Sequence, residues 1–227
     1  MCGRFSIVAT AEKIKAQLEI NLENSAPLLA SYNIAPTQSA LVITNDAPNK
    51  LQTFRWGLIP HWAKDHRFGA KLINARSEGI ASKPSFRIPI RKKRCLIVAD
   101  SFYEWKKSGG QKYPYRILLA DKQLMLMAGI WDEWRSGNYF YQTFSIITVR
   151  PNEEMSSIHT RMPVILKRKE QQRKWLEDIS IEQIQDLLQT PDDDILKVYR
   201  VSQKINSVKH NNSDLHEEVD DDLLTLF

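Results

Sequence analysis

The stretch 124–149, LMLMAGIWDEWRSGNYFYQTFSIITV, contains two long β-like runs joined by a turn. Residues 124–131 and 139–149 are rich in β-branched and aromatic side chains, which favour strands. Ser136-Gly137-Asn138 between them has the composition of a hairpin connection. The stretch therefore predicts a long antiparallel hairpin around which a sheet can form.

Similar runs recur along the rest of the chain. They lie at 5–8, 40–44, 52–59, 95–99, 113–120, 162–166 and 196–202. Gly109-Gly110 has the composition of a second hairpin connection, and helices are expected at 11–19, capped by Thr10, and at 170–177 and 181–189. The expected fold is α+β: a single domain on antiparallel or mixed β-sheet, barrel-like, with a few flanking helices.

The chain of 227 residues is long enough for one large domain or two small ones. Its longest apolar runs, such as 96–99 and 124–130, are too short to span a bilayer, so no membrane partner is expected. We find no signal peptide, and the two cysteines, Cys2 and Cys95, do not form a disulfide framework. These features favour the cytoplasm.

Charge is distributed unevenly along the chain. Residues 211–227 contain six acidic residues and no Lys or Arg, whereas the whole chain has 32 basic and 27 acidic residues. Residues 1–210 therefore carry 32 basic and 21 acidic residues, a net charge of +11. We expect a domain over 1–210 and an acidic, flexible tail over 211–227. The basic domain favours a polyanion partner, nucleic acid first, and the alternative is a solvated basic surface.

Cys2 stands directly after Met1. Removal of Met1 would leave an α-amine and a thiol on adjacent carbons, and this pair condenses with an aldehyde to a thiazolidine. The reference pKa values, about 8 for the amine and about 8.5 for the thiol, leave reactive forms of both groups at neutral pH. The alternative is that Cys2 is merely a small apolar residue.

Three further polar residues stand out from their surroundings. Asn74 follows an apolar segment, and His159 is one of only five histidines. Glu104 lies between Tyr103 and Trp105, where burial would raise the pKa of its carboxyl toward the range useful for proton transfer. The alternatives are an exposed acid at a strand end and a structural or solvated histidine.

Aromatic and arginine side chains alternate along the chain, as in Arg55-Trp56 and Phe86-Arg87. Guanidinium groups bind phosphates and rings stack on bases, so this pattern favours single-stranded nucleic acid. The alternative is that the aromatics belong to the core, which we expect for Trp56 and Trp131. The histidines show no metal-ligand spacing and there is no Gly-rich phosphate loop, so neither a metal nor a nucleotide cofactor is expected.

Seven short motifs follow one another along the chain. They are Met1-Cys2-Gly3-Arg4-Phe5, Tyr32-Asn33-Ile34-Ala35-Pro36-Thr37, Arg55-Trp56-Gly57-Leu58-Ile59-Pro60, Asn74-Ala75-Arg76-Ser77-Glu78, Phe102-Tyr103-Glu104-Trp105, Ala128-Gly129-Ile130-Trp131 and His159-Thr160-Arg161-Met162-Pro163. Together they resemble the SOS-response-associated peptidase (SRAP) family, whose bacterial and eukaryotic members shield abasic sites in single-stranded DNA. The resemblance runs from Cys2 to about Asn206.

This resemblance implies a role for each of four residues. Cys2, freed of Met1 by self-removal, would trap the aldehyde of the ring-opened sugar in a thiazolidine DNA–protein crosslink. Glu104 would shuttle protons, and His159 would help open the sugar ring and assist Schiff-base chemistry, including a weak abasic-site lyase reaction. Asn74 would hold the amino terminus or the sugar hydroxyls.

The resemblance also implies a set of residues that contact the DNA strand. They are Arg4, Arg76 and Arg161 on phosphates, Pro36 and Trp105 against bases, and Thr148 on a further phosphate. The implied protein is a monomer without metal or cofactor, in a bacterial cytoplasm at the nucleoid or replication fork. The segment Leu223–Phe227 resembles the peptide by which repair proteins dock on the sliding clamp, but Leu223 stands where that motif prefers Gln.

Two other functions remain open at this stage. A cysteine peptidase of the amino-terminal-nucleophile kind would use Cys2, His159 and Glu104 as nucleophile, base and orienting group, but the sequence reveals no oxyanion hole or substrate groove. A passive single-strand binding module would need only the basic surface, and Cys2 would then be dispensable.

Overall fold

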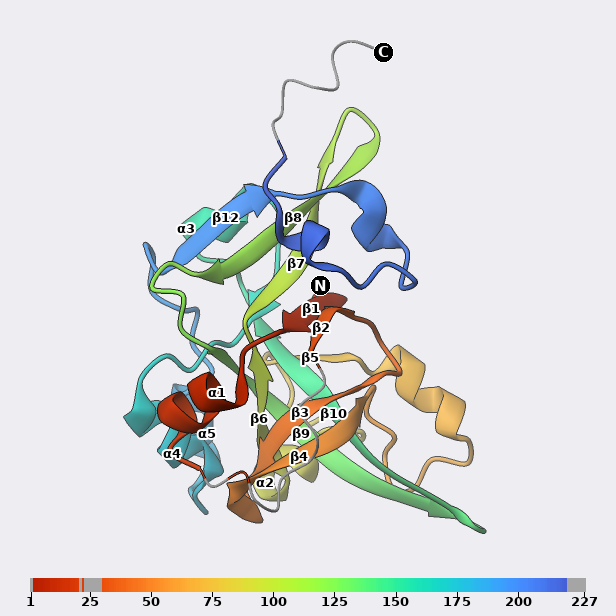
Figure 1. Cartoon of the computed structure of the whole chain (residues 1–227). Helices are drawn as coiled ribbons and strands as arrows, with labels where there is room; N and C mark the ends of the chain where they lie inside the picture. The colour runs from red at the N-terminus through yellow and green to blue at the C-terminus, as the bar shows by residue number, and fades with distance from the viewer. Residues whose placement is uncertain (1, 21, 23–29, 220–227) are drawn as a thin grey trace.

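The computed structural model of the chain describes residues 2–20, 22 and 30–219 (Figure 1). The predicted hairpin is present as β9 (Met125–Ser136) and β10 (Tyr139–Val149), which pair antiparallel from Ser136 opposite Tyr139 to Gly129 opposite Ile146. Gly137 makes the turn with a φ of 55°. Both strands are long, and they lie next to each other in the β-barrel.

Five strands form a closed ring. In order around the ring they are β10, β4 (Ala47–Trp56), β3 (Ser39–Thr44), β6 (Arg94–Ala99) and β9, which returns to β10. The β10–β4 pair is parallel, with Phe144 opposite Trp56, and the other pairs are antiparallel. The short strands β5 (Asn74–Arg76) and β11 (Met162–Pro163) also pair with β10. The ring confirms the predicted barrel-like sheet.

A second, antiparallel sheet covers one end of this barrel (Figure 1). Its strands, in spatial order, are β12 (Leu196–Arg200), β8 (Gln111–Leu119), β7 (Ser101–Ser108), β1 (Arg4–Ile7) and β2 (Ser31–Ile34). Gly109 and Gly110 connect β7 to β8, as predicted. The sequence patterns missed β2 and β5, which are too short to show a period, and β7, whose outer half is polar.

Helices flank the sheets and are short. They are α1 (Ala11–Leu18), α2 (Pro89–Lys92), α3 (Glu153–Ser156), α4 (Lys169–Leu176) and α5 (Ile181–Asp186), with 3₁₀ turns η1 (His66–Lys71), η2 (Gln203–Asn206) and η3 (Ser213–His216). Thr10 caps α1 as predicted, since its side chain accepts a hydrogen bond from the Lys13 amide at 3.3 Å. No helix within the described ranges is long and apolar enough to cross a membrane.

Aromatic packing joins the two sheets. Trp56 of the barrel is fully buried and packs against Phe5 of β1 and Phe144 of β10, with ring centroids 4.9 and 6.4 Å away. Its indole nitrogen donates to the Ile73 carbonyl at 2.9 Å. Trp131 is also buried, which confirms the core assignment for both tryptophans. Because Phe5 stands only a few residues from the start of the chain, this packing fixes the amino-terminal strand on the barrel.

The beginning of the predicted acidic tail packs on the domain. Within 211–219, η3 buries Leu215 completely, next to Tyr103 and Tyr199. The Tyr32 amide donates to Asn211 Oδ1 at 2.7 Å. The rest of the tail, including Leu223–Phe227, lies outside the described residues, so the domain boundary and the clamp-binding segment stay predictions.

A close approach of two backbones at Gly57 generates a stability prediction. Gly57 follows β4 with a φ of 120°, and a Cβ there would lie 2.7 Å from the Gly69 carbonyl oxygen. We expect Gly57→Ala to lower the free energy of unfolding by about 3 kcal/mol, because backbone strain and a clash add. Gly137→Ala is the control: φ is 55°, no heavy atom lies within 4 Å, and the cost should stay near 1 kcal/mol. Urea denaturation of both variants measures the difference, and equal losses would contradict the argument.

Candidate functional site

The pairing of β1 with β7 brings Cys2 and Glu104 together. Arg4 stands opposite Tyr103, so the residues just before β1 lie beside Glu104 on β7. The Cys2 side chain is fully buried, and its thiol donates to the Arg4 carbonyl at 3.7 Å. Burial, and next the negative charge of Glu104, raise the pKa of the Cys2 thiol well above its usual value. The thiol is therefore protonated at neutral pH, in contrast to the partly ionised thiol expected from the reference pKa.

Asn74 holds the backbone of Cys2 from the other side. It is the first residue of β5, which pairs in parallel with β10 so that Asn74 lies opposite Ile146. Asn74 Nδ2 donates to the Cys2 carbonyl oxygen at 2.8 Å. Its Oδ1 is buried and accepts no hydrogen bond within the part of the chain that the structure describes. The Asn74 amide nitrogen thus holds the Cys2 carbonyl, and the amide oxygen can accept a further hydrogen bond.

Glu104 and His159 form the opposite wall of the site. Glu104 is only 2% exposed, so the alternative of an exposed acid at a strand end is wrong. The nearest oxygen of its carboxylate lies 4.0 Å from His159 Nδ1. His159 Nδ1 lies 3.0 Å from the Arg161 amide nitrogen, which can donate to it, and 3.2 Å from the Arg161 carbonyl oxygen. In the tautomer that accepts the amide hydrogen, the proton of the neutral imidazole is on Nε2. The pair can therefore accept and deliver protons at neighbouring positions.

A hollow of about 480 Å³ opens beside Glu104 and His159. It is also lined by Trp105, Lys107, Lys112 and Asn206. Trp105 Nε1 donates to Asn206 Oδ1 at 2.8 Å. The two lysines are exposed and make the opening positive. Neither lysine nor Asn206 was among the predicted site residues, although Lys107 stands close to Trp105 in the sequence.

Arg161, Thr148 and Arg76 lie side by side next to this wall. Thr148 of β10 stands opposite Arg76 of β5. Arg161 donates to the Thr148 carbonyl oxygen and makes two hydrogen bonds to the Glu78 carboxylate, at 2.6 and 2.8 Å. Thr148 is fully buried, whereas Arg76 is exposed. Of these three predicted DNA contacts, only Arg76 has an open side chain.

Arg4 and Pro36 are both half-buried. Arg4 Nη1 donates to the Gly3 carbonyl at 2.9 Å, and burial lowers the pKa of its guanidinium. Pro36 lies in the turn between β2 and β3, just before Thr37, which has a φ of 73°. The structure thus brings Cys2, Asn74, Glu104 and His159 together in one place. The roles predicted for these four residues and for the six DNA-binding candidates stay predictions.

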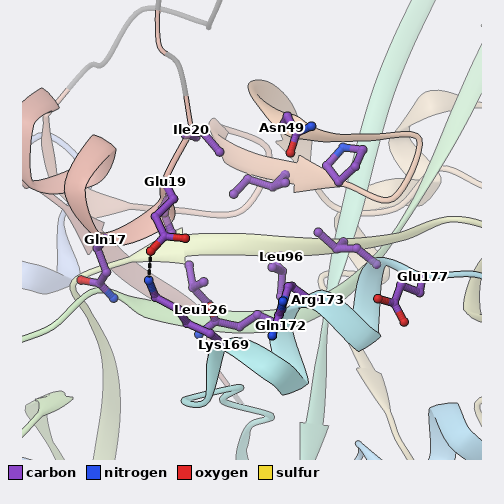
Figure 2. Close-up of a pocket in the computed structure, with 14 residues that line it drawn as sticks. Gln17, Glu19, Ile20, Asn49, Leu96, Leu126, Lys169, Gln172, Arg173 and Glu177 are labelled. Atoms are coloured by element: carbon purple, nitrogen blue, oxygen red, sulfur yellow. Dashed lines mark hydrogen bonds and ion pairs between the residues drawn. The ribbon is translucent and has the colours of Figure 1, made fainter.

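A second hollow, of about 510 Å³, lies away from these residues, between α1, the β3–β4 hairpin and α4. Figure 2 shows Leu96 and Leu126 in it and Lys169 reaching Glu19, with which it forms an ion pair. Its lining contains no cysteine or histidine. No cluster of three or more His, Cys, Asp or Glu side chains in residues 2–20, 22 and 30–219 is placed to hold a metal ion.

Comparisons with known proteins agree on one family. A family model described as SOS response associated peptidase (SRAP) matches residues 1–208. The chain is 45% identical over 226 residues to the abasic site processing protein YoqW of Bacillus subtilis (strain 168). This match covers 96% of this chain and 99% of the relative. It is 34% identical over 209 residues to the abasic site processing protein HMCES of Gallus gallus, with 77% of this chain and 59% of that protein covered. A crystal structure of a Bacteroides thetaiotaomicron protein superposes with a TM-score of 0.86 at 30% identity, over 96% of this chain and 100% of that one.

The charge of Glu104 next to a buried thiol generates a chemical prediction. Because that charge raises the pKa of the Cys2 thiol, Glu104→Gln should lower this pKa and increase the thiolate fraction. Alkylation of Cys2 by iodoacetamide at mildly alkaline pH should then be about threefold faster or more. Cys95 is an internal control, since burial alone raises the pKa of its thiol. Peptide mass spectrometry follows both residues, and a Cys2 rate that stays constant or falls would contradict the electrostatic account.

Proposed function

The chain belongs to the SOS response associated peptidase (SRAP) family, and on this basis we propose that it processes abasic sites in single-stranded DNA. The proposed reaction is covalent capture of the ring-opened sugar by Cys2, which shields the lesion in a thiazolidine crosslink. Two facts support the reaction: relatives that match almost the whole chain are named abasic site processing proteins, and Asn74 fixes Cys2 beside Glu104. The position of Cys2 between Asn74 and Glu104 is the observation that carries the proposal.

The amine of Cys2 is an amide nitrogen until Met1 is removed. Cleavage of that bond supplies the primary amine, and the Asn74 bond to the Cys2 carbonyl keeps the new terminus in place. Holding both reacting groups in one orientation lowers the barrier by several kcal/mol relative to free reactants. Asn74 Oδ1, which accepts no hydrogen bond from the described residues, is the proposed partner of the new amine.

The covalent steps balance with the loss of one water. The sugar hemiacetal opens to the C1′ aldehyde when its hydroxyl loses a proton and the ring oxygen gains one, and His159 Nε2–H is the proposed donor. The Cys2 amine then adds to C1′, and loss of water gives an imine. The sulfur then adds to the same carbon, the C=N bond becomes a C–N single bond, and the proton lost by sulfur is passed on to the nitrogen as the five-membered ring closes.

Glu104 is the proposed acceptor of the thiol proton. The thiol is held protonated by its surroundings, so sulfur becomes nucleophilic only as the proton leaves. The buried carboxylate next to it, with His159 4.0 Å beyond, provides a short route for that proton. A weak lyase reaction follows from the same imine, when a base removes a C2′ proton before the sulfur closes the ring and the 3′ phosphate leaves.

Binding of the strand is proposed for the positive margin of the site. Lys107 and Lys112 are exposed at the hollow, and Trp105, which also lines it, has a ring on which a base can stack. Arg76 is exposed on β5, opposite Thr148. Unpaired bases reach such a ring only in a single strand, which supports the preference for single-stranded DNA.

The peptidase alternative has support only from the family's name, and self-removal of Met1 is the one cleavage that this proposal includes.

Crosslinking to an abasic strand tests the proposal directly. Wild-type protein incubated with single-stranded DNA carrying one aldehydic abasic site should give a protein–DNA band that survives heating in denaturant. Cys2→Ala should abolish that band, whereas Cys95→Ala, the matched control for the other buried thiol, should retain it. A passive binding module would retard DNA without a denaturant-resistant species, and a peptidase would cleave peptides instead; either result without the adduct rejects the proposal.

Blocking the amine separates thiazolidine formation from simple thiol addition. Protein that retains Met1, or whose Cys2 amine is acetylated, should form no stable adduct, because imine formation requires a primary amine. Titration of thiols after unfolding verifies that sulfur is intact in the blocked protein. Equal crosslinking rates for the blocked and free forms, measured on denaturing gels, would show that sulfur acts without the amine.

A further inference from the structure

Glu78 and Arg161 form a two-point ion pair next to the proposed active site. Arg161 Nη1 donates to Glu78 Oε1 at 2.6 Å, and Arg161 Nη2 donates to Glu78 Oε2 at 2.8 Å. Both terminal nitrogens of the guanidinium therefore face one carboxylate. This is the geometry in which a guanidinium also binds the two oxygens of a phosphate diester.

The two partners differ in how firmly they are held. The Arg161 side chain is only 11% exposed, and it also donates to the Thr148 carbonyl oxygen of β10. The Glu78 side chain is 56% exposed, on the outer side of the pair. Displacement of Glu78 would return its carboxylate to water and break its two hydrogen bonds to Arg161, which the incoming phosphate would replace. Arg161 would remain hydrogen-bonded to β10. Glu78 is therefore the partner of this ion pair that another anion can replace, whereas Arg161 stays in place.

The position of Arg161 links this pair to the catalytic groups. Its amide donates to His159 Nδ1 at 3.0 Å, and Thr148, which it contacts, stands opposite Arg76 in the β5–β10 pair. Arg161 is thus hydrogen-bonded to His159 through its backbone and to the strand that pairs with Arg76 through its side chain, so an anion that replaced Glu78 would bind next to the proposed active site. A strand whose abasic sugar reached Cys2 would bring its phosphates to this place.

We propose that Glu78 is a placeholder for a DNA phosphate: it occupies the Arg161 guanidinium in the free protein, and a backbone phosphate of the bound strand displaces it. The inference rests on the proposed function, because the anion is taken to be that of single-stranded DNA. Glu78 preorganises Arg161 and, as its competitor for phosphate, lowers the affinity for DNA.

Protonation does not operate this exchange. The hydrogen bonds from Arg161 are the main cause that lowers the pKa of the Glu78 carboxyl to about 2. The carboxylate therefore stays ionised throughout the neutral and mildly acidic range, and only another anion can take its place. Displacement by phosphate, and not a change in pH, is the event that frees Arg161.

Neutralising Glu78 is the test. Glu78→Gln keeps the size of the side chain but removes its charge. The side chain then competes less strongly with a DNA phosphate for the Arg161 guanidinium, and DNA should bind about threefold more tightly. The probe is a single-stranded oligonucleotide with one tetrahydrofuran residue, which has no aldehyde, so that the dissociation constant is measured without crosslinking. Glu78→Ala should shift the dissociation constant in the same direction, and it replaces the Gln variant should that one fail to fold.

Glu19→Gln is the matched control. Glu19 is also an exposed acid paired with one cation, Lys169, but it lies at the other hollow (Figure 2). Its neutralisation changes the net charge by the same amount, and the dissociation constant should change less than about twofold. The same Glu78→Gln change is then made in an Arg161→Lys background, where the two-point contact is absent and the gain should disappear.

Three results would contradict the proposal that Glu78 is a placeholder for a DNA phosphate. They are Glu78 variants that bind the probe no more tightly than the wild type, a gain no larger than that of Glu19→Gln, and a gain that persists with Lys at position 161. Crosslinking of wild-type protein to aldehydic DNA is measured on the same preparation. A wild type that crosslinks alongside Glu78 variants that bind no better refutes the placeholder alone, whereas a wild type that forms no adduct refutes the proposed function.

Discussion

The position of Cys2 in this domain depends on how β1 is held. β1 pairs with β7 on one side and β2 on the other, and Phe5 packs on Trp56 of the barrel. Amino-terminal residues of most domains are poorly ordered unless they are tied to a sheet or core. Here the sheet and the aromatic contact together fix Cys2, and Asn74 adds a hydrogen bond to its carbonyl. A residue that would otherwise fray is thereby held within reach of a carboxylate and an imidazole.

Much of this arrangement is readable from the sequence. Runs of β-branched and aromatic residues locate most strands of the barrel, and the turns at Gly137 and Gly109-Gly110 fix two hairpins. The four central residues of the site are readable for a different reason. Each combines an unusual setting with a place in a motif that resembles one family, so a chemical argument and a resemblance select the same side chains.

The sequence could not predict contacts that depend on distant segments. Trp105 bonds Asn206 across a separation of 101 residues, and Glu78 meets Arg161 across 83. No local pattern encodes such pairs, because Trp105 lies on β7 and Asn206 in η2, and Glu78 and Arg161 lie in separate loops that only the fold brings together. The protonated state of the Cys2 thiol has the same origin. Its reference pKa describes a solvated thiol, whereas the folded chain removes water from it and places a carboxylate alongside.

The packing of residues 211–219 has a consequence for self-association. The barrel is a closed ring, but the second sheet ends at β2, whose outer backbone groups would otherwise be open to another chain. Asn211 takes the hydrogen bond of Tyr32, and Asn33 Nδ2 donates to the carbonyls of Ser207 and His210, so the terminal segment covers this edge. A chain cut before this segment would expose an unprotected edge strand, and strand addition between copies would compete with the fold of the single chain.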